Sequence, residues 1–186
     1  MRIVARYSFC HGLELITTKH HKELSEVTSA IQSVDAEHFR TKQSKEKTMP
    51  GRLLYAPKLI NSAILDGFLY KCPDTWNTPE RKLRINHEIP GIGGSTVTFT
   101  TDGVKNRVAL EIQLGKYAFV EYDICAKLPT YKKFDRIECA IEVLPMNVMV
   151  RQMSTGPGWF ERTATILANR GFGQLDVPVL LIGIDS

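Results

Sequence analysis

The chain has 186 residues, of which 43% are hydrophobic and 24% are charged, and its formal net charge is +4 at pH 7. This composition is ordinary for a soluble globular protein and excludes a disordered or low-complexity chain. The length allows a sizeable core, so we expect a single domain over residues 1–186. The positive charge is mild, and its placement matters more than its size.

The four cysteines are scattered, without a Cys-x-x-Cys pair. They therefore predict neither a zinc site nor a disulfide framework, and we expect inert thiols in a reducing compartment. Arg6 and His11 interrupt any apolar run near the N-terminus, and no stretch approaches the roughly 18 apolar residues of a membrane span. We expect a cytoplasmic protein with no membrane partner.

The first third of the chain begins with a predicted strand and continues with predicted helices. Ile3 to Tyr7 predicts the short strand. His20 to Val34 has helical spacing, and Pro57 opens a second helix that continues to Leu69.

A basic loop separates the two predicted helices. Arg40 to Arg52 holds five Lys or Arg residues against a single Glu46. Such a loop is either solvated surface or a binding site for phosphates. In the second case Lys42 and Lys45 supply charge and Ser44 supplies a hydroxyl donor.

The rest of the chain predicts a sheet. Residues 71–95 are rich in Pro, Gly and charge, and we expect a connection there with one more short helical segment. Further elements are predicted as strands at Ser95–Thr101, Tyr117–Ile124, Phe134–Leu144 and Pro178–Ile184, and as a helix at Phe160–Asn169. The pattern predicts an α/β fold with a mixed central β-sheet flanked by helices.

The most informative stretch runs from Thr100 to Asp123. Val108 to Leu114 alternates apolar residues on one face with Ala109, Glu111 and Gln113 on the other. A two-residue turn at Asn106-Arg107 would pair Asp102 with Glu111. Directly opposed residues lie roughly 4.5–5.5 Å apart at Cβ, so the two carboxylates would share one site.

Two carboxylates that close repel each other unless a cation lies between them. Oxygen ligands suit Mg²⁺, which would bind Asp102, Glu111 and the carbonyl of Ile112. Gln113 is uncharged, so it can orient a water or a phosphate oxygen but cannot act as a general base. The alternative is a solvated hairpin whose charges meet no ligand.

The residues Asp102, Glu111 and Gln113, in the pattern Asp-x8-Glu-x-Gln, resemble the catalytic motif of the PD-(D/E)xK nucleases, in the variant where Gln replaces Lys. More closely, the chain resembles type II restriction endonucleases of the BstYI and BglII type, over most of its length outside residues 71–95. The blocks that match in the same order are Val34–Thr48, Val104–Asp123, Ile141–Met146, Met153–Gly156 and Pro178–Ile184.

The resemblance implies a restriction-endonuclease-like fold and a Mg²⁺-dependent homodimer that cuts both strands of a palindrome in double-stranded DNA. It also implies a site with a GATC centre, four-base 5′ overhangs and a bacterial or archaeal host. Asp102 and Glu111 would bind the metal, and Gln113 would complete the catalytic site.

Other residues are candidates for secondary roles. Lys116 would read base edges, since a regular strand turns it away from the acids, although an ordinary surface lysine is the alternative. Ser154 and Thr155 precede a Gly-Pro-Gly turn and would present hydroxyls to the outer base pair. Glu37 is either an auxiliary acid or a solvated one. For Glu142 we expect a structural ion pair.

Three functions are compatible with these features. The leading one is a site-specific endonuclease, and the others are a monomeric nicking or repair nuclease of the same fold and a DNA-binding protein without catalysis. The acids argue against the last, because carboxylates on one strand face would repel phosphates.

Overall fold

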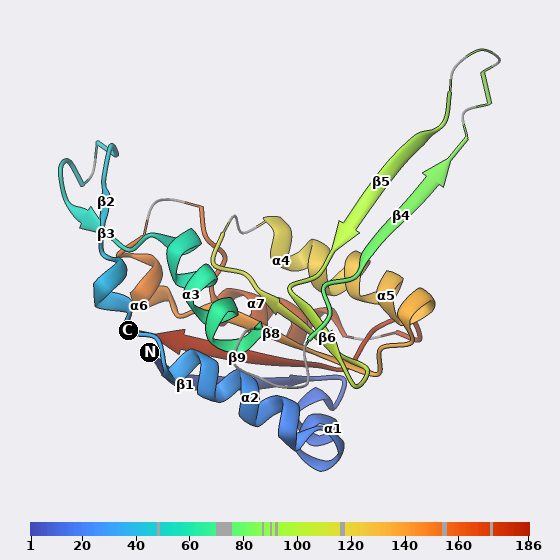
Figure 1. The fold of residues 1–186 in the computed structure, drawn as a ribbon, viewed down its shortest axis with the longest axis horizontal. Coiled ribbons are helices and arrows are strands. Elements are labelled where there is room, and N and C mark those ends of the chain that lie inside the picture. Colours follow the sequence, from blue (N-terminus) through green and yellow to red (C-terminus); the bar gives the residue numbers. More distant parts are fainter. Residues whose placement is uncertain are drawn as a thin grey trace.

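A five-stranded mixed sheet in the order β1-β9-β8-β7-β6 forms the centre of the computed structural model (Figure 1). The structure describes residues 1–47, 49–69, 76–86, 88–89, 91, 93–115, 118–153, 156–171 and 173–186. The five strands are β1 (Arg2–Phe9), β6 (Gly103–Lys105), β7 (Val108–Ile112), β8 (Cys139–Pro145) and β9 (Val179–Asp185). β7, β8 and β9 are parallel, whereas β1 and β6 pair antiparallel at the two edges.

Helices cover both faces of this sheet. One face packs against α1 (Gly12–Lys19), α2 (His21–Gln32) and α3 (Pro57–Leu69). The other face packs against α4 (Ala118–Tyr122), α5 (Leu128–Asp135) and α7 (Phe160–Arg170). A short helix, α6 (Asn147–Val150), follows β8. The predicted α/β fold with a mixed central sheet flanked by helices is confirmed, and it is consistent with a restriction-endonuclease-like fold.

Strand β7 is buried on both faces because it lies inside the sheet between two helical layers. Val108, Leu110 and Ile112 join the core under α2 and α3. Ala109 joins the core under α4 and α5, and Glu111 lies on that same face. The predicted alternation of this strand is therefore confirmed.

The hairpin of β6 and β7 has the predicted turn. Val104 pairs with Ala109 and Lys105 with Val108. Asn106 and Arg107 have φ values of 46° and 69°, which are the positive values that a two-residue turn of this hand requires. The register continues toward Asp102 and Glu111, as expected from the sequence.

Two predictions in the second half of the chain are wrong. The segment expected as a strand over Tyr117–Ile124 is helical over its described residues, from Ala118 onward, with α4 followed by a five-residue π-helical segment, Asp123–Lys127 (η2), and then α5. The strand expected over Phe134–Leu144 begins only at Cys139. The buried positions Val120, Ile124 and Leu128 recur every four residues, which is a helical period and not the alternation of a strand.

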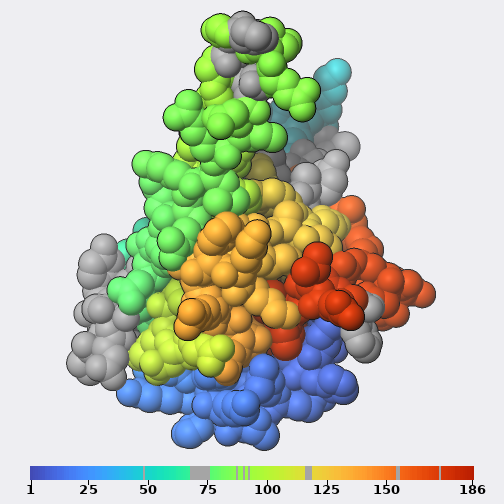
Figure 2. All heavy atoms as spheres, turned by 90° about the vertical axis from the view of Figure 1, so that its right-hand side faces the viewer, coloured from blue at the N-terminus to red at the C-terminus, as the bar shows by residue number. Residues whose placement is uncertain are grey.

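Residues 71–95 also depart from the prediction, as far as the structure describes them. Instead of a helical segment, β4 (Glu80–Ile85) pairs antiparallel with β5 (Ser95–Thr100) in a two-stranded ribbon. The ribbon projects from the body of the molecule (Figures 1 and 2). Its base is fixed to α5, because the single proton of the Tyr131 hydroxyl lies within hydrogen-bond reach of the carbonyls of Pro79 and Phe99, at oxygen–oxygen distances of 2.8 and 3.0 Å. Helix α1 was not predicted.

The basic loop forms a second small hairpin. It follows a 3₁₀ turn, Ala36–Phe39 (η1), and consists of β2 (Lys42–Gln43) and β3 (Leu53–Leu54). This hairpin lies at the opposite end of the molecule from the β4–β5 ribbon (Figure 1).

Candidate active site

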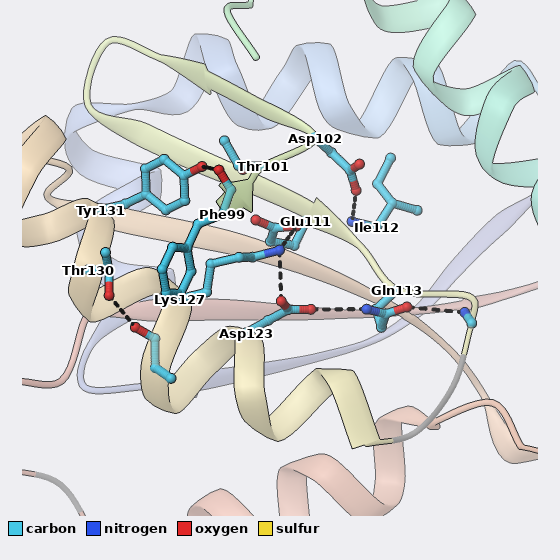
Figure 3. Close-up of polar contacts among 12 residues, drawn as sticks. Phe99, Thr101, Asp102, Glu111, Ile112, Gln113, Asp123, Lys127, Thr130 and Tyr131 are labelled. Carbon is cyan, nitrogen blue, oxygen red and sulfur yellow. Dashed lines mark hydrogen bonds and ion pairs between the residues drawn. The ribbon is translucent and has the colours of Figure 1, made fainter. Parts of the chain in front are cut away.

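Asp102 and Glu111 meet at the open end of the β6–β7 hairpin (Figure 3). Asp102 immediately precedes β6, and one of its carboxylate oxygens accepts a hydrogen bond of 2.7 Å from the Ile112 backbone N–H. Glu111 is only 4% exposed. The structure therefore places the two predicted metal ligands at the same end of the hairpin.

Gln113 extends the same edge of the site. Its side-chain Nε2 donates to Asp123 Oδ2 at 3.0 Å, and its Oε1 accepts from the Gly115 N–H at 3.3 Å. All three members of the predicted motif thus lie at the carboxyl end of β7.

Two further residues of this site, Asp123 and Lys127, lie on the π-helical segment and were not predicted from the sequence. Lys127 Nζ lies 2.8 Å from Glu111 Oε2 and 2.7 Å from Asp123 Oδ1 (Figure 3). The strand predicted over Tyr117–Ile124 hid the pair, because residues four apart lie one turn from each other on a helix, whereas along a strand they are roughly 13 Å apart. The signal that could have found them is an Asp and a Lys at that spacing between apolar residues of period four.

Glu142 is a further acid on the same face. It is fully buried in β8, and its Cα is the register partner of Glu111. Neither of its carboxyl oxygens has a hydrogen-bond partner among the described residues. The ion pair predicted for Glu142 is therefore wrong.

The electrostatics follow from burial and crowding. Burial raises the pKa of Glu111 to about 8, although Lys127 opposes the shift. Burial also raises the pKa of Asp102 and raises that of Glu142 well above its usual value. Burial alone would lower the pKa of Lys127, but Glu111 and Asp123 outweigh it and raise that pKa. Among the described residues, a single ammonium, that of Lys127, faces these carboxyl groups.

In the described part of the chain, no three Asp, Glu, His or Cys side chains converge as a ready metal site. The donor set nevertheless fits a hard cation. Glu111 Oε1 is buried with no hydrogen-bond partner among the described residues, and the carboxylate of Asp102 lies at the same strand end, against the Ile112 N–H. Two carboxylates with few further protein ligands suit Mg²⁺, which retains several waters.

The predicted phosphate contacts lie on the β2–β3 hairpin. Lys42 and Lys45 are exposed there. Ser44 is buried, and its hydroxyl accepts a hydrogen bond of 3.2 Å from the Glu46 N–H, so it shapes the loop. Whether these residues touch DNA stays a prediction.

Glu37 belongs to a different group of residues. Its carboxylate accepts two hydrogen bonds from Arg40, at 2.8 and 2.9 Å, and one from the Tyr55 hydroxyl. These bonds lower the pKa of Glu37 to about 2. These partners include none of the acids around Glu111, so the structure does not join Glu37 to the site. Lys116, Ser154 and Thr155 lie outside the described residues.

The mixed sheet flanked by helices, with acids at the end of the β6–β7 hairpin, is consistent with the restriction-endonuclease-like class of α/β proteins. A family model described as "Restriction endonuclease BglII/BglIII" matches residues 4–184, nearly the whole chain. The chain therefore belongs to this family and is a type II restriction endonuclease, a DNA-binding hydrolase that cleaves double-stranded DNA at specific sites. Restriction endonucleases of this kind typically depend on a divalent metal ion.

Comparison with curated proteins gave no match. None of the described helices is both long enough and apolar enough to cross a bilayer.

Proposed function

We propose that this enzyme is a Mg²⁺-dependent homodimer that cuts both strands of a palindromic DNA site, with a GATC centre and four-base 5′ overhangs. The observation that carries the proposal is the placement of Asp102 and Glu111 at the same end of the β6–β7 hairpin, where Asp102 accepts from the Ile112 N–H and Glu111 Oε1 is buried without a partner among the described residues. We also propose the bacterial or archaeal cytoplasm as its location.

In this proposal Asp102, Glu111 and the Ile112 carbonyl hold the metal. When bound, Mg²⁺ polarises the scissile phosphate and lowers the pKa of a bound water. Gln113 accepts a hydrogen bond from the attacking water and orients it, but its amide takes up no proton. The buried position of Glu111 excludes bulk water and strengthens each of these interactions.

We propose that the DNA is read by residues outside this centre. Lys116 follows the catalytic strand and would donate to guanine O6 and N7 in the major groove. Ser154 and Thr155 would contact the outer base pair, with Thr155 setting the preference there. Lys42 and Lys45 would contact phosphates from the β2–β3 hairpin, and Ser44 would contribute a hydroxyl.

The test is digestion of unmethylated plasmid with Mg²⁺, followed by sequencing of the product ends. Double-strand cuts at one palindrome with four-base 5′ overhangs are expected. Asp102→Asn and Glu111→Gln should abolish cleavage and retain specific DNA binding, because each removes charge and keeps side-chain volume.

Other outcomes identify the alternatives. Nicked circles as the final product, from a protein that stays monomeric on DNA, would indicate a nicking nuclease. Specific binding without any cut would indicate a non-catalytic DNA-binding protein. Cleavage by Asp102→Asn near the parent rate would place the metal centre elsewhere.

A further inference from the structure

The carboxylate of Asp123 joins two parts of the active site. It is 2% exposed, and its two oxygens have different partners. Oδ2 accepts from Gln113 Nε2 at 3.0 Å, and Oδ1 accepts from Lys127 Nζ at 2.7 Å (Figure 3). Asp123 thus connects an amide on the sheet with an ammonium on the helix.

This contact fixes which way the Gln113 amide faces. A carboxylate only accepts hydrogen bonds, so Gln113 must turn its NH₂ group toward Asp123. Its carbonyl oxygen then faces away from Asp123, where the Gly115 N–H reaches it only at a long 3.3 Å. A carbonyl oxygen has two lone pairs, so it can still accept a hydrogen bond from a water molecule.

Lys127 anchors the other end of this chain of contacts. It comes from the same π-helical segment as Asp123, four residues later, and is 9% exposed. Single-turn π segments recur at functional sites, where they re-aim side chains. The same ammonium also bonds Glu111 at 2.8 Å, so it links both predicted catalytic residues of β7 to the helix.

We propose that Asp123 and Lys127 are positioning residues of the nuclease centre. Asp123 fixes the polarity of the Gln113 amide so that its carbonyl accepts from the attacking water, and Lys127 holds Asp123 and Glu111 in place. The residue that follows β7, Gln113, is an uncharged amide, and the ammonium described at the site, that of Lys127, comes from the helical layer. The inference rests on the proposed function, which assigns Asp102, Glu111 and Gln113 to cleavage.

A double-mutant cycle tests the first link. Gln113→Glu places two carboxylates against each other, and Asp123→Asn leaves a single carbonyl oxygen where Gln113 and Lys127 each had a carboxylate oxygen of their own. Each should slow single-turnover cleavage of bound DNA by about 10²-fold, the scale of a misplaced reacting group. In the double variant the introduced amide donates to the introduced carboxylate, so cleavage should recover at least tenfold over Gln113→Glu alone. Losses that simply multiply would overturn the proposal.

Lys127→Met tests the second link, and the chain offers a matched control. Lys105 is 7% exposed and forms a buried ion pair of 2.8 Å with Glu26, on the other side of the sheet. Both Lys→Met variants should lower thermal stability. Only Lys127→Met should also slow single-turnover cleavage, by about 10²-fold, with Lys127→Arg recovering part of the rate. Equal single-turnover cleavage rates for the two Met variants would show that Lys127 has only a structural role.

A metal-free readout keeps the test independent of activity. The side-chain amide signal of Gln113, assigned by its loss in Gln113→Glu, should move in the ¹H–¹⁵N spectrum of Asp123→Asn and Lys127→Met. It should stay in place in Lys105→Met. An unmoved signal in Asp123→Asn would overturn the contact on which the proposal depends.

Asp102→Asn, assayed in parallel, separates this inference from the proposed function. If Asp102→Asn cuts like the parent, the proposed centre itself fails. If Asp102→Asn is inactive while Asp123→Asn and Lys127→Met cut near the parent rate, the centre stands and only the positioning role fails.

Discussion

Glu111 and Glu142 are register partners on the adjacent parallel strands β7 and β8. Neighbouring strands lie about 4.8 Å apart, so two carboxyl groups lie side by side on one buried face. Three of their four oxygens have no hydrogen-bond partner among the described residues. The free-energy cost of burying these carboxyl groups is therefore concentrated at the place where we propose that a cation binds.

The first prediction concerns the pH dependence of stability in the metal-free enzyme. Burial raises the pKa of Glu111 to about 8 from an ordinary 4.5, so the folded protein keeps a proton that the unfolded chain releases. The free energy of unfolding should therefore fall as pH rises between these values, the stabilising contribution being complete below the lower one.

Urea unfolding in EDTA at a series of pH values would measure this. In Glu111→Gln the free energy of unfolding should depend less on pH, because the amide does not titrate. Parallel curves for parent and variant would show that Glu111 does not bind the extra proton.

The second prediction concerns Glu142, whose carboxyl group is buried without a partner among the described residues. Glu142→Met keeps a similar volume and removes the buried polar group, so it should stabilise the protein by about 1–3 kcal/mol near pH 8. Urea unfolding measures the change, and Glu88→Met, which replaces an exposed acid, is the control. A loss of stability in Glu142→Met would mean that the carboxyl group has a stabilising partner in solution.

The third prediction concerns the basic hairpin. If Lys42 and Lys45 bind phosphates, replacing either by Ala should weaken binding to all DNA sequences alike. The slope of log K against log salt should fall by roughly 0.9 for each phosphate that is no longer neutralised. Lys19→Ala, on the exposed end of α1, should leave the slope unchanged. An altered sequence preference at constant slope would show that the loop reads bases.

The fourth prediction concerns oligomeric state. A palindrome read by two equivalent half-sites requires two-fold symmetry in the protein. Analytical ultracentrifugation should therefore detect a dimer, at least on target DNA. Monomer alone, with and without DNA, would contradict the homodimer and support nicking.

The fifth prediction concerns the close approach of α1 to β9. A Cβ added at Gly12 would overlap the backbone of Val179, which no side-chain rotation relieves. Gly12→Ala should therefore cost about 1–3 kcal/mol or more in unfolding experiments. Gly93→Ala, where a Cβ meets nothing within 4 Å, is the control and should be close to neutral. Equal stability of both variants would contradict the close approach.

The sequence alone determined the elements whose pattern is local. The alternation of Val108 to Leu114 predicted β7, and the two residues Asn106 and Arg107 predicted its turn and hence the pairing of Asp102 with Glu111. Helices α2, α3 and α7 were predicted in the same way, from the helical period of their apolar residues and, for α3 and α7, from the Pro and Gly residues near their ends. In each case the residues that carry the pattern are close together in the sequence.

Only the tertiary structure decided the rest of the site. The apolar residues of 117–124 were interpreted with a strand period, and the helix that packs there brings Asp123 and Lys127 against β7. Periodicity assigned Glu142 to a strand but could not say that Glu111 is its neighbour, because strand order depends on how helices cross over the sheet. A local pattern fixes which face a side chain takes, whereas its partners across the sheet come from packing of segments far apart in the chain.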